Sequence, residues 1–391
     1  MPSVEFSGIT YYPDILCTPG EHMGYRRLSD QDKDSIVPIF GLSRRPSAPD
    51  LTDSIRMITE SVGDRPFLLD LDPRPAPPPY VARDPADPAA DRRRVAAETQ
   101  AQESYNRELR RLLSAQDGFA AWREFCNIFP EAVPVLQFED PVADGLDLLR
   151  QAAMLARGGN SIAIKIRQDT DPAIIGLVAQ TIAILDHPGQ LLIVIDCGQG
   201  RLRISERAEF ARTRMQAILS ELSVTQRPEV RAVCMSNSFN TPNHSGLRDR
   251  PTPNLDWRLW REASEVYPFA FGDYAATHRP GAHSSFQPRD WRATVVYPLG
   301  ESWLAYRAPN TNDEQGWIDG AVAIRDRPEY PPAPGVWGVE MIEQAAGDDL
   351  EGLNSARFWY AAKVNIHIHR QLAYSAEQLA AASNGDDDGE I

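Results

Sequence analysis

Short apolar runs alternate with segments of helical spacing along most of this chain, and this alternation limits its possible folds more than any other feature. Eight runs carry the β-branched and aromatic residues typical of strands. They span Ile9 to Ile15, Ile36 to Leu42, Pro66 to Leu71, Val133 to Phe138, Ser161 to Ile166, Gln190 to Ile195, Val230 to Met235 and Pro268 to Phe271. Between them, apolar residues recur three or four apart, as at Leu146, Leu149 and Ala153, the spacing of one helix face. The order is therefore βαβα.

This order predicts strands that are parallel and buried. The run from Leu191 to Ile195 is apolar at every position, as expected of a strand that meets the barrel interior on one face and helices on the other. Eight such strands are the number in a closed parallel barrel, which routinely uses 250 residues or more as one domain. We therefore expect an α/β fold, a (β/α)8 TIM-like barrel, as a single domain over residues 1–375 of the 391.

Additions to the minimal barrel are visible in the composition. Residues 73–90 are dense in proline, which blocks helix and central strand, and predict a long surface excursion; a charged, exposed helix follows it. Residues 286–340 read as a late β-rich insertion, with an antiparallel hairpin formed by Arg292 to Tyr297 and Trp303 to Arg307. Residues 376–391 end in an acidic run and predict a disordered tail.

An added C-terminal segment, Asn354 to Tyr374, must pack because it carries too much apolar surface to remain exposed. Its secondary structure stays open. Val364, Ile366 and Ile368 alternate with polar residues as in a strand, which would put His367 and His369 on one face, whereas a helix would separate the two histidines.

Charge and cysteine usage exclude several classes of protein. The net charge of −15 argues against broad binding to duplex nucleic acid, which depends on Lys and Arg replacing counterions. No run approaches the length of a membrane span, and the first residues lack the pattern of a signal peptide. The four cysteines show no CxxC spacing, so we expect buried thiols in a cytoplasmic protein.

Polar residues follow the predicted strands, where the active sites of such barrels form. The candidate catalytic residues are Lys165, Asp196, Asp273 and His367, and the candidate ligand-binding residues are Asp70, Glu139, Arg167, Ser236, Tyr274 and His369. Lys165 and Arg167 share a face because strand side chains repeat every two residues, and together they suit a phosphate. A cluster of carboxylates suits a divalent metal ion. Whether the protein depends on a metal ion stays open. The alternative is that these charges pair only among themselves.

The chain resembles the phage beta-protein family, which occurs in phages and bacterial genomes. The matching features run in order along nearly the whole chain: Tyr12-Pro13, Ile36-Val37-Pro38-Ile39, Phe271-Gly272-Asp273-Tyr274, the hairpin with Tyr297 and Arg307, and Trp359 with His367 and His369. The resemblance implies a barrel fold and a phage-related setting, anti-phage defence included, without naming a reaction.

Three hypotheses about function follow. In the first, a phage-related or anti-phage-defence barrel recognises a small phosphorylated or nucleotide-like ligand in its mouth and acts with a partner protein. In the second, a metal-dependent, phosphodiesterase-like hydrolase uses Asp70, Asp72, Glu139 and Asp196 as ligands of the ion, with Lys165 stabilising charge. In the third, the protein is a non-catalytic interaction scaffold. A barrel fold alone does not decide among them.

Overall fold

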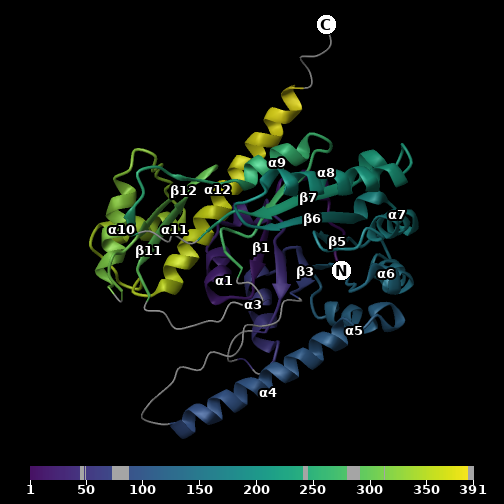
Figure 1. Ribbon diagram of the computed structural model, residues 1–391, viewed down its shortest axis with the longest axis horizontal. Helices are drawn as coiled ribbons and strands as arrows, with labels where there is room; N and C mark the ends of the chain where they lie inside the picture. Colours follow the sequence, from purple (N-terminus) through teal and green to yellow (C-terminus); the bar gives the residue numbers. More distant parts are fainter. Residues whose placement is uncertain are drawn as a thin grey trace.

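Eight parallel strands form the centre of the molecule in a computed structural model, which describes residues 1–44, 48, 50–72, 88–240, 245–279, 291–311 and 313–385 (Figure 1). The strands are β1 Tyr11–Leu16, β2 Ile39–Leu42, β3 Phe67–Leu71, β4 Ala132–Pro134, β5 Ile162–Arg167, β6 Leu191–Gln199, β7 Arg231–Asn237 and β10 Ala270–Asp273. Their order is β4-β3-β2-β1-β10-β7-β6-β5, and a parallel bridge between Val135 and Ala163 joins β4 to β5. The predicted (β/α)8 barrel is confirmed.

Helices surround these strands, and three 3-10 turns lie in the connections (Figure 1). They are α1 Pro19–Arg26, α2 Asp30–Asp34, α3 Thr52–Val62, α5 Gln116–Cys126, α6 Pro141–Leu155, α7 Ile174–Ile184, α8 Ile204–Glu221, α9 Asp256–Ser264, η1 Phe6–Gly8, η2 Pro188–Gln190 and η3 Arg227–Glu229. Alternate residues of each strand pack to opposite sides: in β6, Ile193 and Ile195 belong to the core beneath the helices, whereas Leu192 and Val194 fill the barrel interior. This period of two positions the site described below.

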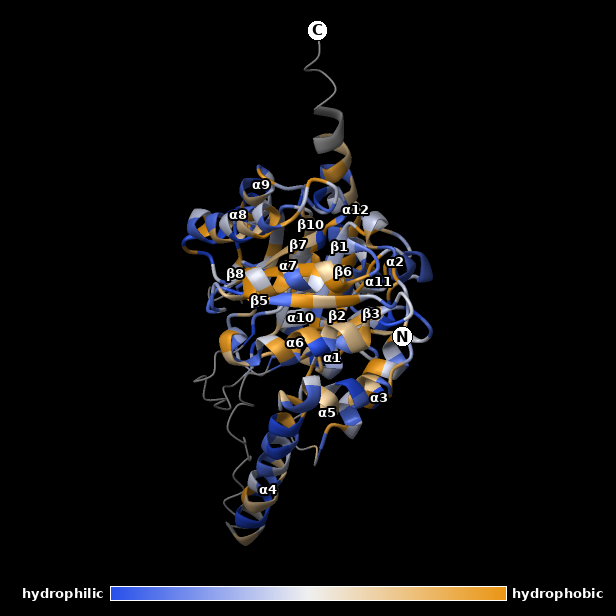
Figure 2. Cartoon of the chain, turned by 90° about the vertical axis from the view of Figure 1, so that its right-hand side faces the viewer, coloured by the Kyte–Doolittle hydropathy of each residue, from blue (hydrophilic) through white to orange (hydrophobic). Residues whose placement is uncertain are grey.

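The helix α4, Pro88–Leu112, extends away from the barrel (Figures 1 and 2). It corresponds to the charged helix predicted from the sequence, and most of its described residues are exposed and hydrophilic. Tyr105, near its end, is buried in the barrel core. Residues 73–87, which hold most of the predicted proline-rich excursion, lie outside the described residues.

A second unit follows β10 and has its own hydrophobic core, which includes Tyr297 and Trp317. The predicted hairpin is confirmed: β11 Thr294–Pro298 pairs with β12 Ser302–Arg307 in antiparallel fashion, and the short strands β8 Gly246–Leu247 and β9 Thr252–Pro253 join β12. The expectation of a β-rich insertion over residues 286–340 needs correction, because two helices, α10 Gln315–Arg325 and α11 Trp337–Ala346, follow the hairpin.

These two helices have a pattern that the sequence contains. In α10, Trp317, Ala321 and Ile324 are buried in the second core, at the i, i+4, i+7 spacing of a helix face. The second core also shows that the chain has two centres of packing, whereas the sequence predicts a single domain over residues 1–375; whether the two behave as one folding unit stays a prediction.

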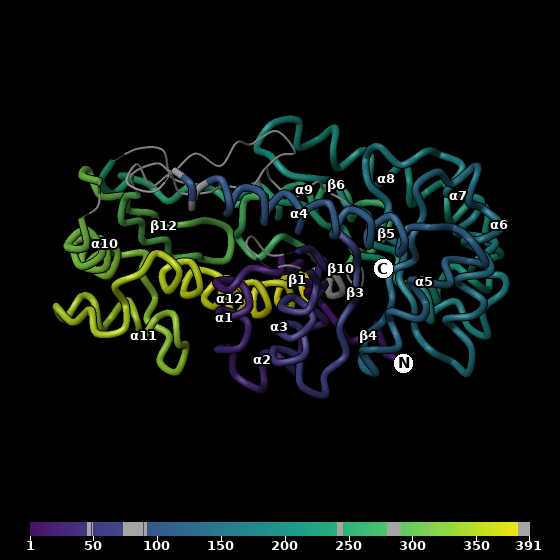
Figure 3. The backbone as a smooth tube through the Cα atoms, turned by 90° about the horizontal axis from the view of Figure 1, so that it is seen from below, coloured from purple at the N-terminus to yellow at the C-terminus, as the bar shows by residue number. Residues whose placement is uncertain are grey.

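The C-terminal segment is one long helix, α12, Ala356–Gly385, which packs against α1 between the barrel and the second unit (Figure 3). Val364 and Ile368 belong to the barrel core, whereas Ala362 and Ile366 belong to the second core. Residues four apart share a helix face, and residues two apart lie on nearly opposite faces. The strand-like alternation of the sequence is therefore the pattern of a helix that is buried on two sides.

The same helix occupies the place of the eighth barrel helix, because it follows β10 in the chain and returns against β1. It continues to Gly385, ten residues into the segment for which the sequence predicts a disordered tail. The physical reason is composition: Ala376, Ala380, Ala381 and Ala382 have the highest helix propensity of all residues. The acidic residues 386–391 lie outside the described residues.

All four cysteines are buried free thiols, as expected: Cys17, Cys126, Cys197 and Cys234. Among the helices of the described ranges, none is long and apolar enough to cross a membrane.

Candidate functional site in the barrel mouth

The inward-facing positions of the strands change from apolar to charged at the carboxyl end of the barrel. In β5, Ala163 fills the interior and Lys165, two residues later, is the next inward position; in β6, Val194 is followed in the same way by Asp196. The period of two therefore brings charges from different strands into one layer. All of these side chains are buried, so they must satisfy one another or a ligand.

Lys165 lies at the centre of this layer. Its Nζ is 2.8 Å from Asp14 Oδ2, 3.5 Å from Asp70 Oδ2 and 3.8 Å from Asp196 Oδ2. The four residues come from β5, β1, β3 and β6, and the Lys165 side chain is only 4% exposed. One ammonium group thus contacts carboxylates from three other strands.

Two guanidinium groups complete the layer. Arg167, whose side chain is 37% exposed, places Nη2 3.3 Å from Asp70 Oδ2. Arg279 forms an ion pair with Asp14 and stacks over the ring of Tyr274, with its Cζ 4.1 Å from the ring centroid. We call these six charged residues, Lys165, Arg167, Arg279, Asp14, Asp70 and Asp196, the mouth network; its three cations balance its three carboxylates.

Electrostatics keep Asp14 ionised within this network. Burial by itself raises the pKa of Asp14, but the adjacent Arg279 guanidinium and Lys165 ammonium outweigh it and hold that pKa at about 2. Tyr274 donates its hydroxyl hydrogen to Asp196 Oδ1 across 2.6 Å. Burial raises the pKa of Tyr274 well above its usual range, and the neighbouring Asp196 carboxylate adds to this effect, so Tyr274 stays a donor at neutral pH.

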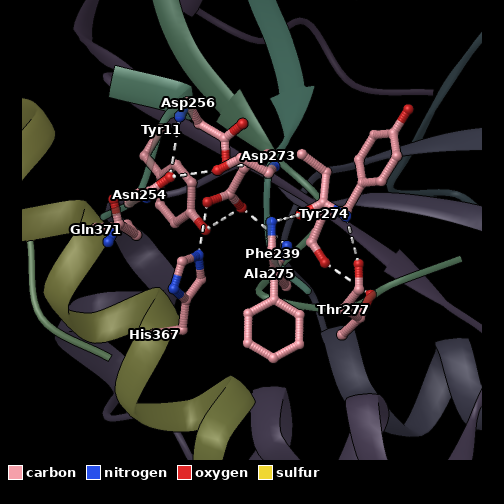
Figure 4. Close-up of polar contacts among 12 residues, drawn as sticks. Tyr11, Phe239, Asn254, Asp256, Asp273, Tyr274, Ala275, Thr277, His367 and Gln371 are labelled. Carbon is pink, nitrogen blue, oxygen red and sulfur yellow. Dashed lines mark hydrogen bonds and ion pairs between the residues drawn. The ribbon is translucent and has the colours of Figure 1, made fainter. Parts of the chain in front are cut away.

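Asp273 does not join the mouth network. Its neighbour Tyr274 belongs to the interior cluster, so Asp273 points to the other side of the strand. There its Oδ1 accepts a hydrogen bond from Tyr11 OH at 2.8 Å, and its Oδ2 lies 2.6 Å from His367 Nε2 (Figure 4). The expectation that Asp273 and His367 share one mouth with Lys165 needs correction: the two form a buried pair between β10 and α12.

Three more candidates also lie outside the mouth network. Ser236 donates to Asp256 Oδ1 at 2.8 Å, close to the start of α9. Glu139 is exposed just before α6. His369 is separated from His367, as a helix requires, and places Nδ1 3.0 Å from Asp32 Oδ2 on α2. The structure therefore brings together Lys165, Asp196, Arg167, Asp70 and Tyr274, and it does not bring in Glu139, Ser236, Asp273, His367 or His369.

Sequence reasoning missed two members of the mouth network. Asp14 could have been found from the sequence, because it is the one acidic residue within the otherwise uncharged run from Ile9 to Ile15. A buried carboxylate in a strand requires a partner. Arg279 follows β10 by six residues in a segment without periodicity. Its place beside Asp14 is fixed only by tertiary structure.

The carboxylates of the mouth do not form a ready metal site. Among the described residues, no group of three or more His, Cys, Asp or Glu side chains is placed to hold a metal ion. Lys165 stands among Asp14, Asp70 and Asp196, where its ammonium group takes the position that suits a cation. The ion ligands of the hydrolase hypothesis therefore have no support among the described residues.

Comparison with known proteins supports the resemblance seen in the sequence. Residues 11–373 match the family described as Beta protein. Protein beta of Enterobacteria phage P4 is 27% identical over 384 residues, which cover 95% of each chain. No solved structure matches. These relationships support a phage-related function, and they show that the chain belongs to the Beta protein family.

Proposed function

We propose that this phage-related barrel recognises a small phosphorylated or nucleotide-like ligand at its mouth and acts together with a partner protein. The observation that carries the proposal is that Arg167 is a partly exposed member of the otherwise buried mouth network. Arg167 and Lys165 are two residues apart on β5 and point the same way, and Arg167 alone of the two is accessible, with 37% of its side chain exposed.

The energetics of burial support a binding role. Taking charges out of water is costly, and replacing buried ion pairs by apolar residues is often neutral or stabilising. A barrel end that served only stability would not require six charged residues. Carboxyl ends of barrel strands are also where the ligand sites of this fold form.

Arg167 is held in place for an incoming anion. Asp70 Oδ2 accepts from its Nη2, and the hydrogen bond from Arg167 N to Thr170 Oγ1, 2.9 Å long, fixes the backbone at the end of β5. A guanidinium has five N–H donors in a planar fork that matches phosphate oxygens. Within the described part of the chain only one of these donors is used in a hydrogen bond, to Asp70, so the others are left for a ligand.

Titration calorimetry with inorganic phosphate and with a nucleoside monophosphate tests the ligand. We expect both to bind, and Arg167→Gln to weaken the binding at least about tenfold, equivalent to about 1.4 kcal/mol. Arg258→Gln is the matched control, because Arg258 is exposed on α9 and pairs with Glu262. Equal affinity of the two variants, or no binding by the unmodified protein at millimolar ligand, would overturn the proposal.

The partner is proposed to contact α4, which extends from the barrel and is exposed along most of its described length (Figure 1). Arg107 and Arg110 lie on its exposed surface. Co-purification from phage-infected cells tests this contact. We expect a partner protein to co-purify with the unmodified chain and not with the double variant Arg107→Glu/Arg110→Glu. Retention of the same protein by the double variant would exclude α4 as the contact.

A further inference from the structure

A small pocket lies where the barrel meets the second unit, and none of the six residues of the mouth network lines it. It has a volume of about 210 Å3, less than the roughly 300 to 1,000 Å3 of pockets for drug-sized ligands. Its lining consists of Phe239 after β7, Arg292 before β11, Thr294 and Val296 on β11, Trp317 on α10, and Ala356, Trp359, Tyr360 and Lys363 on α12. Four of the nine lining residues are aromatic.

Lys363 brings an unpartnered charge to this pocket. The residue is only 6% exposed, and among the described residues no hydrogen bond or ion pair engages its ammonium group. Its Nζ lies 4.3 Å from the ring centroid of Phe239 and 4.1 Å from that of Tyr360. Burial lowers the pKa of Lys363 to about 7, while the charge of Glu21 opposes this shift. Such a group gains more from an anion than an exposed lysine does.

The neighbouring polar groups are already engaged. Glu21, on α1, accepts hydrogen bonds from Leu16 N at 2.6 Å and from Tyr360 OH at 3.3 Å. Arg292 Nη1 donates to the carbonyl oxygen of Pro309 at 2.6 Å. The acceptors of Arg292 are neutral, so Arg292 keeps its positive charge, and the pocket offers an anion two cations, the buried Lys363 and the half-buried Arg292.

A buried ammonium group, aromatic walls and a small volume select a class of ligand. Aromatic walls favour a flat apolar body, because ring pairs gain from stacked or edge-to-face contacts. A phosphate carries up to two charges and several strong acceptor oxygens, and its usual sites provide an Arg fork or several backbone donors. A carboxylate is smaller and carries one charge, which pairs with the buried ammonium group of Lys363.

We propose that this pocket binds a small planar monocarboxylate, with Lys363 pairing with the carboxylate and the ring lying between the aromatic walls. The site is separate from the proposed phosphate site at the mouth. Only three of the 40 basic residues are lysines, Lys33, Lys165 and Lys363, and the ammonium group of Lys363 is a compact point charge held between two rings.

Calorimetry with benzoate tests the proposal, with benzyl alcohol as the uncharged counterpart. We expect benzoate to bind the unmodified protein at least about tenfold more tightly than benzyl alcohol does, a difference of about 1.4 kcal/mol. Lys363→Met should lose this preference, and Lys33→Met, which alters a half-buried lysine on α2 outside the pocket, should keep it. Equal binding of benzoate to the protein and to Lys363→Met, or tighter binding of inorganic phosphate than of benzoate at Lys363, would overturn the assignment.

A second measurement needs no variant. Reductive methylation with formaldehyde and a borane reagent, followed by peptide mass spectrometry, reports on each of the three lysines separately. Saturating benzoate should slow modification of Lys363 several-fold and leave the rate at Lys33 unchanged. An unchanged rate at Lys363 in the presence of benzoate would count against the proposal even if Lys363→Met failed to fold.

Discussion

Lys165 Nζ lies 2.8 Å from Asp14 Oδ2, and the two side chains are 4% and 1% exposed. Their strands, β5 and β1, are four apart in the eight-strand order, so the ion pair crosses the barrel mouth. A charge in this position is stabilised by its partners rather than by water. The consequences can be measured.

Replacing Lys165 by methionine should destabilise the fold strongly. The variant leaves Asp14, Asp70 and Asp196 without their shared cation, and removing one partner of a buried ion pair costs about 3 to 5 kcal/mol. Denaturant unfolding measures this change. Arg258→Ala, which breaks the exposed pair with Glu262, is the control and should change stability by about 0.5 kcal/mol or less. A loss for Lys165→Met as small as that of the control would show that the network contributes little.

The pH dependence of stability should reveal Glu21. Burial raises the pKa of this carboxyl to about 7 from its ordinary 4.5. Between these two pH values the folded state therefore holds a proton that the unfolded state has released, so stability falls as pH rises through the window, by up to about 3 kcal/mol. Glu21→Gln cannot titrate. The difference in melting temperature between the two proteins, followed from pH 4.5 to 7, should change steadily in favour of the variant; parallel curves would contradict this assignment.

The two histidines of α12 should differ in their contribution to stability. His367→Ala leaves the buried Asp273 Oδ2 without its 2.6 Å partner, which costs about 1 to 3 kcal/mol. His369 is 31% exposed in its pair with Asp32, so His369→Ala should cost at most about 1 kcal/mol. Both variants are expected to fold, as circular dichroism would check. Equal losses in the free energy of unfolding would show that the buried pair of His367 and Asp273 stabilises the fold no more than the pair of His369 and Asp32.

Two truncations should separate the part of α12 that the fold needs from the part that it does not. A chain that ends at Ser375 keeps Val364 and Ile368 in the barrel core and Ile366 in the second core. A chain that ends at Asn354 exposes apolar surface in both cores at once, and exposed patches of that kind lead to aggregation. Size-exclusion chromatography should show a monodisperse peak for the first chain and aggregate for the second; an aggregated first chain would mean that residues beyond 375 are needed.

The mouth shows how far local pattern reaches. Lys165 and Arg167 could be assigned to one face from the period of two. Asp196 was expected after its strand, yet it lies within β6, which continues to Gln199. Asp273 was expected beyond the end of its strand, yet it is the last residue of β10, paired in register with Ser236 and Pro13. Its side of the sheet therefore follows from the alternation along β10, in which Asp273 shares the face of Phe271 and lies opposite Tyr274.

The sequence by itself determined the eight-strand barrel, the hairpin and the charged mouth, because alternation of strand and helix patterns and the period of side chains along a strand are local properties. Tertiary structure alone decided the state of residues 356–385 and the place of Arg279. The alternation of Val364, Ile366 and Ile368 fits a strand until two cores are known to lie on opposite sides of one helix. Arg279 meets Asp14 across 265 positions of the chain, and no local pattern encodes such a contact, since its energy arises only once both side chains are buried together.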